Sequence, residues 1–368
     1  MNLNTLYKKA LNLLPLTKDE ALLLYNDLPP NQLFSLAQQI RFIKVPQKRV
    51  SWQIDRNINY TNVCISGCLF CNFHCKLSER EKSYTIRTDE LKEKILQLRQ
   101  LGGDQILLQG GLHPQYNIHY YEELLSTIKS IDPNIKLNAF GPPEISHIAH
   151  LSSLTIKDTL KRLVKAGLDT LPGAGAEILS DRVRKLLSPG KPSVTEWCNV
   201  MEEAHNMGLG TTATMVYGHI ETLEERIDHL FTIRELQAKK MAKNPGFRAF
   251  ICWPMQIEGT KLNARFITSK TTSLEHLKMV AISRIILNNI THIQASWLTV
   301  GKEIGMLALH SGADDMGSIM IEENVVSSAG ADHKMGSEEI QRTIIDAGFE
   351  PWLRGQDYKP RESSVSLL

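Results

Sequence analysis

The chain has 368 residues, with 42 Lys and Arg against 40 Asp and Glu, which gives a formal net charge of +2 at pH 7. Hydrophobic residues make up 42% and charged residues 22%, values that exclude a disordered, collagen-like or strongly basic nucleic-acid-binding protein. Residues 1–16 lack the apolar core of a signal peptide, and apolar stretches such as 280–287 are too short to span a bilayer. We therefore expect a cytoplasmic protein with no membrane and no nucleic-acid partner.

The predicted elements fall into three parts along the chain. Helical periodicity at 3–14 and 18–28 predicts an N-terminal helical cap over residues 1–45. Residues 46–355 repeat a short apolar strand followed by an amphipathic helix, and residues 356–368 are expected to form a C-terminal tail. Strands are predicted at 50–59, 105–109, 136–140, 169–171, 211–217, 247–253, 292–297 and 316–322. Helices are predicted at 89–101, 120–130, 156–166, 177–187, 194–207, 222–241, 273–287, 302–311 and 337–347.

Eight strand–helix units in succession predict an α/β fold, namely a parallel (β/α)8 barrel of the TIM type. The strand at 316–322 should then close the barrel beside the first strand, at 50–59. A doubly wound open sheet is the alternative. In such barrels the active-site residues lie at the C-terminal ends of the strands and in the loops that follow them.

Four of the six cysteines lie close together, from Cys64 to Cys75. Cys64, Cys68 and Cys71 follow the first predicted strand with the spacing C-x3-C-x2-C, which puts three thiolates on one loop able to hold a cubic iron–sulfur cluster. Cys75 leaves two alternatives open, a four-thiolate zinc site and a four-thiolate ferredoxin-type cluster.

The pattern C-x3-C-x-aromatic-C, with Phe70 in the aromatic position, resembles the signature of the radical S-adenosylmethionine (SAM) superfamily. The resemblance implies that Cys64, Cys68 and Cys71 hold a [4Fe–4S] cluster whose fourth iron binds SAM. It also implies an electron donor such as flavodoxin or ferredoxin. Cys75 departs from the usual pattern, and its role stays open.

Segments at the predicted strand ends, among them 109–114, 139–145, 294–297 and 320–326, resemble the dehypoxanthine futalosine cyclases of the futalosine route to menaquinone. This resemblance covers about residues 50–355. It implies that a 5′-deoxyadenosyl radical takes a hydrogen from ribose C4′ of dehypoxanthine futalosine, and that the carbon radical then attacks the attached benzoate ring. The alternatives are an aminofutalosine synthase-like radical addition enzyme and a non-catalytic four-cysteine iron–sulfur or zinc protein.

Cofactor contacts are expected from the cysteine loop and from two strand ends. Gly110 and Gly111 would let the backbone approach SAM closely, and Glu177 would bind its ribose or amino group. A tight turn for the glycines and a helix N-terminal carboxylate for Glu177 are the competing interpretations. The expected cofactor-binding residues are Phe70, Gln109, Gly110, Gly111 and Glu177.

The substrate carries a benzoate and a ribose, so its site needs a cation and polar partners. Arg56 is expected to bind the benzoate carboxylate and Trp297 to stack on a ring, with Asn324 as a further substrate contact. A salt bridge in the barrel wall and core packing are the alternatives for Arg56 and Trp297. The closing oxidation requires a base. The candidates at predicted strand ends are His113, Glu144, His219 and Glu322.

Overall fold

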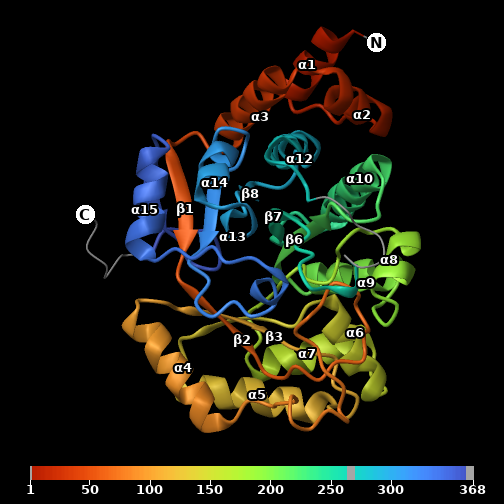
Figure 1. The fold of residues 1–368 in the computed structure, drawn as a ribbon, viewed down its shortest axis with the longest axis vertical. Coiled ribbons are helices and arrows are strands. Elements are labelled where there is room, and N and C mark those ends of the chain that lie inside the picture. The colour runs from red at the N-terminus through yellow and green to blue at the C-terminus, as the bar shows by residue number, and fades with distance from the viewer. Residues whose placement is uncertain (1, 263–269, 362–368) are drawn as a thin grey trace.

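The structure, a computed structural model, describes residues 2–262 and 270–361 of the chain. Its N-terminal part is a cap of three helices, α1 (Leu3–Leu11), α2 (Lys18–Asp27) and α3 (Pro30–Lys44). The sequence pattern predicts the first two but not α3, which begins at a proline because this residue is well tolerated in the first turn of a helix. The cap lies over α10 (Leu223–Lys239) and α12 (Ser273–Ile286), which α2 and α3 contact (Figure 1).

A parallel sheet forms the centre of the molecule, and its ten strands in the described residues follow the order β10-β1-β9-β8-β7-β6-β5-β4-β3-β2. β1 and β2 are separated only by Ile54 and form one bent strand. β2 pairs with β3, whereas β1 pairs with β9 and β10. The sheet therefore curves round into a barrel of eight strand positions, to which β10 is added. The strands are β1 (Arg49–Gln53), β2 (Asp55–Asn59), β3 (Gln105–Gln109), β4 (Lys136–Ala139), β5 (Thr170–Leu171), β6 (Gly210–Tyr217), β7 (Gly246–Pro254), β8 (His292–Gln294), β9 (Asp315–Ser318) and β10 (Glu350–Leu353).

The predicted (β/α)8 barrel is confirmed, and so is the pairing of the segment at 316–322 with the first strand, which a bridge from Arg56 to Ile321 extends. An open sheet is excluded because the bent first strand has β3 on one side and β9 on the other. None of the helices in the described residues is long and apolar enough to cross a bilayer. Those outside the cap are α4 (Thr88–Gln100), α5 (Ile118–Ile131), α6 (Pro142–Leu151), α7 (Ile156–Ala166), α8 (Asp181–Leu187), α9 (Val194–Asn206), α10, α12, α13 (Trp297–Val300), α14 (Lys302–Leu309), the 3-10 helix η1 (Ser327–Ala329) and α15 (Ser337–Asp346).

Several elements differ from the prediction. α6 and β10 occupy segments that the sequence pattern does not assign. The helix predicted from Glu177 begins only at α8, because Glu177 itself has a φ of +40°, which a helix does not accept. The strand predicted over 292–297 ends with β8, and Trp297 instead starts the short helix α13.

The first residues of the expected C-terminal tail pack against the N-terminal end of the barrel. Arg361 forms an ion pair of 2.9 Å with Asp104, just before β3. Arg248, near the start of β7, donates a hydrogen bond of 3.0 Å to the carbonyl of Asp357. Residues 356–361 thus belong to the barrel floor, and residues 362–368 lie outside the described part of the chain.

A buried ion pair ties α12 to β8 and to the turn before β9. Arg284 is fully buried and donates to Asp314 at 2.5 Å and to the carbonyl of Gly312 at 2.7 Å. The other oxygen of Asp314 lies 2.6 Å from His292 Nδ1. Burial raises the pKa of Asp314, but His292 and Arg284 outweigh this and hold that pKa at about 2.

Asp314→Asn is expected to lower the free energy of unfolding by about 3–5 kcal/mol, because it leaves the Arg284 guanidinium buried without a counter-charge. Denaturant unfolding measures this loss. Since the pKa of Asp314 is depressed, its contribution is fully present above pH 4 and is lost as the pH falls towards 2. Asp228→Asn, which breaks an exposed pair with Lys18, is the control and should change stability by less than about 1 kcal/mol. Equal effects of the two variants would contradict this account.

Candidate active site

A cavity of about 320 Å³ runs through the barrel and is lined by side chains from every strand between β1 and β9. Phe70, Glu177 and Lys191 lie at the end where the strands finish, and Arg248 lies near the start of β7. At about 3.3 Å per residue, the part of β7 from Arg248 to Pro254 spans about 20 Å. The cavity therefore extends along most of the barrel axis.

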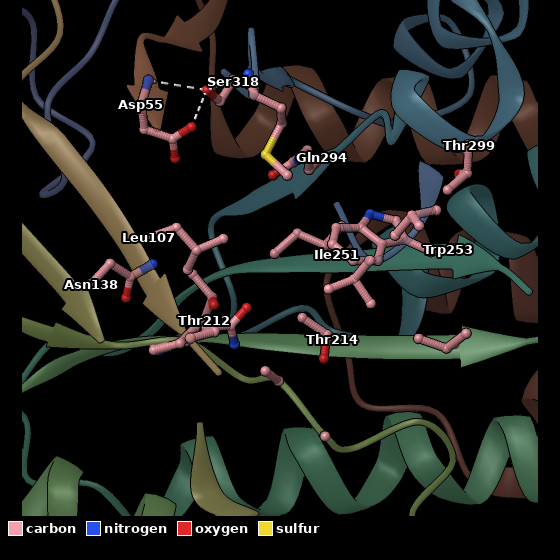
Figure 2. A pocket seen from close by; sticks show the side chains of 18 of the residues that line it. Asp55, Leu107, Asn138, Thr212, Thr214, Ile251, Trp253, Gln294, Thr299 and Ser318 are labelled. Atoms are coloured by element: carbon pink, nitrogen blue, oxygen red, sulfur yellow. Dashed lines mark hydrogen bonds between the residues drawn. The ribbon is translucent and has the colours of Figure 1, made fainter. Parts of the chain in front are cut away.

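The cavity wall combines polar and apolar side chains, which on β3 come from every second residue. Gln105, Leu107 and Gln109 of β3 all line it, while the residues between them point away. Figure 2 shows Thr212 of β6 across the cavity from Asp55 of β2. The interiors of TIM barrels are usually filled with side chains, so an open cavity with both apolar and polar lining residues indicates a ligand that has apolar and polar parts.

The loop that carries the cysteines follows β2 and is fixed by contacts with other segments. Ile65 N–H donates to the carbonyl of Leu112 at 3.1 Å, and Leu69 N–H donates to that of Leu187 at 2.9 Å. Gly190 packs so closely on the loop that a Cβ there would lie 2.7 Å from a backbone atom. The loop is thereby held over the C-terminal end of the barrel.

Cys64, Cys68 and Cys71 are free thiols on this loop. The Ser66 hydroxyl lies 3.0 Å from Cys64 Sγ and 3.2 Å from Cys68 Sγ, so these two sulfurs are both within hydrogen-bonding distance of the same hydroxyl. Burial raises the pKa of the Cys71 thiol, but hydrogen bonds with His74 outweigh burial and lower it. The loop thus carries the three thiols that a cubane cluster would need as iron ligands, and Phe70 of the same loop lines the cavity.

Cys75 is placed differently. Its N–H donates to the carbonyl of Asn62 at 2.9 Å, and its own carbonyl accepts from Cys64 N–H at 3.0 Å. The Cys75 thiol is buried and donates to Asn62 Oδ1 at 3.4 Å. These bonds favour a structural role for Cys75 over that of a fourth ligand.

A buried pair of charges lies beside the cysteine loop, inside the cavity. Lys191 Nζ is 2.6 Å from Glu177 Oε1 and 5.3 Å from the centre of the Phe70 ring. Glu177 Oε2 is buried without a hydrogen-bond partner among the described residues. Burial raises the pKa of Glu177, but Lys191 and Arg184 outweigh it, so the pKa is lowered and the carboxylate is charged. Oε2 also lies 3.6 Å from Arg184 NH1, so Glu177 is held between two cations and keeps one oxygen without a hydrogen bond among the described residues.

The two glycines expected to approach SAM have a packing explanation. A Cβ on Gly110 would lie 2.7 Å from the Tyr60 ring, and one on Gly111 would lie 2.1 Å from the carbonyl oxygen of Val63. Gln109 lines the cavity, whereas the glycines do not. The tight turn therefore accounts for both glycines.

Two of the four expected bases lie outside the cavity, on the helix side of the strand ends. His113 is stacked on Tyr116, with 3.6 Å between ring centres, and burial lowers its pKa. Glu144 accepts hydrogen bonds from the Tyr60 hydroxyl at 2.8 Å and from the N–H groups of Gly110 at 3.0 Å and Gly141 at 2.8 Å. Burial raises the pKa of Glu144 to about 7. Its two oxygens accept hydrogen bonds from the Gly110 turn and from the residue before α6, so they are occupied by the backbone.

The other two expected bases are engaged by neighbours and do not line the cavity either. His219 has a fully buried side chain, 2.7 Å from Glu221. Glu322 accepts from Arg56 at 2.7 Å and also pairs with Lys94 of α4. Arg56 itself points away from the interior, because side chains alternate along a strand and Asp55 points inward. The barrel-wall salt bridge is thus the observed role of Arg56.

The remaining expected substrate contacts are also structural. Trp297 is buried, and its indole N–H donates to the carbonyl of Ser318 at 3.2 Å, outside the cavity. Asn324 donates to Asn59 Oδ1 at 3.2 Å. From the same segment, Val325 and Val326 line the cavity in its place.

Asp55 is a functional candidate that the sequence reasoning missed. Together with Glu177 it supplies the carboxylates that line the cavity in the described residues. Asp55 accepts hydrogen bonds from the hydroxyl of Ser318 and from the amide of Gln105, the latter at 3.2 Å, and it has no ion pair with a described residue. Burial raises its pKa. The period-two pattern of β2, with Asp55 and Arg56 on opposite faces, could have identified it.

A sequence profile of the radical SAM superfamily matches residues 58–233, and a profile described as the CofH/MqnC C-terminal region matches residues 244–367. Residues 234–243, from the second half of α10 to just before β7, lie between the two profiles. The fold and the cysteine loop therefore define the class, that of radical SAM enzymes, which use a [4Fe–4S] cluster and SAM.

Curated relatives of known name show to which family within the radical SAM enzymes the chain belongs. The cyclic dehypoxanthine futalosine synthase of Streptomyces coelicolor is 42% identical over 94% of this chain and 85% of its own length. The synthase of Halalkalibacterium halodurans is 39% identical over 98% and 95%. A 5-amino-6-(D-ribitylamino)uracil–L-tyrosine 4-hydroxyphenyl transferase of Methanosarcina barkeri is 37% identical over 93% and 90%. The chain belongs to the CofH/MqnC family of radical SAM enzymes, in which these synthases and transferases are its relatives.

Solved structures share the fold at lower sequence identity. Methylornithine synthase (PylB) superposes with a TM-score of 0.70 over 94% of this chain and 97% of its own, at 18% identity. The [FeFe]-hydrogenase maturase HydG has a TM-score of 0.74 over 95% and 76%, also at 18% identity. These likenesses show the fold alone.

Proposed function

We propose that the protein converts dehypoxanthine futalosine to cyclic dehypoxanthine futalosine in the futalosine route to menaquinone. The observation that carries this proposal is the identity of 42% and 39% with two synthases of that name over almost the whole chain. A cavity inside the barrel that combines apolar and polar lining residues and reaches Phe70 of the cysteine loop suits a substrate with a ribose and a benzoate. When bound, the cluster and SAM supply a 5′-deoxyadenosyl radical that abstracts hydrogen.

The chain's own residues position the reactants and exclude water. Cys64, Cys68 and Cys71 would hold the cluster, and Glu177 Oε2, which pairs with Arg184 at 3.6 Å but makes no hydrogen bond among the described residues, would accept a hydrogen bond from SAM. The cluster needs a one-electron donor, for which we propose flavodoxin or ferredoxin, and we propose that the enzyme works in the cytoplasm.

Asp55 takes the role of the base. After ring attack, the cyclised radical must lose one electron, for which the oxidised cluster would be the one-electron acceptor, and one proton, which needs an acceptor that faces the cavity. Glu177 is held by Lys191, whereas Asp55 contacts only uncharged donors, Ser318 and Gln105. Burial raises the pKa of Asp55 and outweighs the hydrogen bond from Ser318 and the charge of Arg354, which both lower it, so that Asp55 binds a proton more readily.

The test is mass spectrometry of the products of reduced, cluster-loaded enzyme. With dehypoxanthine futalosine and SAM we expect the cyclic product, together with free 5′-deoxyadenosine. A parallel incubation with 5-amino-6-(D-ribitylamino)uracil and L-tyrosine is expected to give no coupled product. Coupling in the second incubation without cyclisation in the first would assign the transferase activity instead.

A further inference from the structure

Among the described residues, Arg248 is the cation that lines the cavity without an ion-pair partner. Lys191, Arg248 and Arg354 are the Lys and Arg residues that line it within the described part of the chain. Lys191 is paired with Glu177 at 2.6 Å, and Arg354 is paired with Asp315 at 2.6 Å. Arg248 forms no ion pair with a described residue.

Arg248 is held in place by its surroundings. Its NH1 group donates to the carbonyl of Asp357 at 3.0 Å, which fixes one side of the guanidinium. Nε is buried and has no hydrogen-bond partner among the described residues. A Cβ on Gly210 would lie 2.4 Å from this Nε, so the glycine at the start of β6 makes room for the guanidinium.

Neutral donors without partners line the same cavity. The side-chain amide nitrogens of Gln53 and Gln356 are buried and unpartnered within the described residues. Gln356 directly precedes Asp357, which orients Arg248. A buried donor left without a partner costs about 1–3 kcal/mol, so such groups indicate a missing acceptor. A guanidinium with amide donors in the same cavity suits a carboxylate.

We propose that Arg248 binds the benzoate carboxylate of the substrate, so that the substrate lies along the barrel axis with its ribose towards the cysteine loop. This inference rests on the proposed function, which supplies the benzoate. The orientation follows from the position of Arg248 near the start of β7, at the opposite end of the cavity from Phe70 and Lys191. Arg56, which the sequence suggested for this role, is paired with Glu322 outside the cavity.

The experiment measures the dissociation constant of the substrate for holoenzyme with SAM but without reductant, so that no turnover occurs. The substrate is compared with its benzamide analogue, in which the carboxylate is replaced by an uncharged amide. Wild-type enzyme is expected to bind the acid about 10- to 100-fold more tightly than the amide, as a lost hydrogen bond between charged groups predicts. R248Q should bind the two equally, and R248K should recover part of the preference.

Arg56→Gln is the matched control, because it removes a strand arginine that does not line the cavity. It should keep the wild-type preference for the acid. Equal binding of acid and amide by wild-type enzyme, or an undiminished preference in R248Q, would overturn the proposal, and the first result does not depend on any variant folding.

Product formation by wild-type enzyme, measured in parallel, tests the proposed function separately from the role of Arg248. Cyclic product without an Arg248-dependent preference leaves the proposed function standing and removes this inference. An Arg248-dependent preference for the acid without cyclic product supports carboxylate binding and removes the proposed function.

Discussion

Replacing Cys64, Cys68 or Cys71 singly with Ala is expected to abolish SAM cleavage, whereas Cys75→Ala retains it. Each of the first three thiols is free and lies on the loop at the mouth of the cavity. Removing one leaves an iron of the cubane without its protein ligand, so the cluster is lost. The Cys75 thiol instead donates a hydrogen bond to the side-chain oxygen of Asn62.

Iron and sulfide content, the change of the cluster's EPR spectrum on addition of SAM, and the yield of 5′-deoxyadenosine measure this effect. Cys75→Ala serves as the matched control, being the same substitution on the same loop. If Cys75→Ala lost iron as completely as the other three variants, the site would bind its cluster through four thiolates and would leave no iron open for SAM.

Substrate deuterated only at ribose C4′ is expected to give 5′-deoxyadenosine that carries one deuterium and a cyclic product that carries none. A radical takes a hydrogen only from a C–H bond within contact distance, so the label reports which atom the cavity presents. An adenosyl group found inside the product would instead indicate radical addition of the aminofutalosine synthase kind. Unlabelled 5′-deoxyadenosine beside the cyclic product would show that another hydrogen is taken.

The same labelled substrate tests the base. Asp55→Asn is expected to keep deuterium transfer but to lower formation of the cyclic product by about 10²- to 10⁴-fold, the usual effect of a general base. An Asp55 that only supported the fold would reduce both signals together. The Asn side chain is close in shape to Asp, and thermal unfolding of the variant checks that the barrel is intact.

Much of the barrel could be predicted because strand–helix alternation is a local property of the sequence. The cysteine loop could also be predicted from the sequence, since the expected cluster ligands lie within eight consecutive residues, from Cys64 to Cys71. The bend at Ile54 and the strand β10 were not predicted, because both depend on pairing between the two ends of the chain.

The site was harder to predict than the fold, for a geometric reason. A position at a strand end does not say whether a side chain faces the cavity or the helices, and Glu144, His219 and Glu322 all face elsewhere. Alternation decides this within a strand, as Asp55 and Arg56 illustrate. Arg248 could not have been found from strand ends at all, because it lies near the beginning of β7.

The pairing of β1 with β9 and β10 also sets the order in which this protein can mature. Ser51 meets Asp315 across 264 residues of chain, and Gln53 meets Arg354 across 301. During synthesis β1 therefore cannot pair with β9 and β10 until almost the whole polypeptide has left the ribosome. Contacts between residues so far apart in the sequence also form slowly. One contact of the cysteine loop also forms late, because Asn72 donates to the carbonyl of Ser328, which lies 256 residues further along the chain. Insertion of the iron–sulfur cluster into a firmly held loop is thus an event that follows translation and does not accompany it.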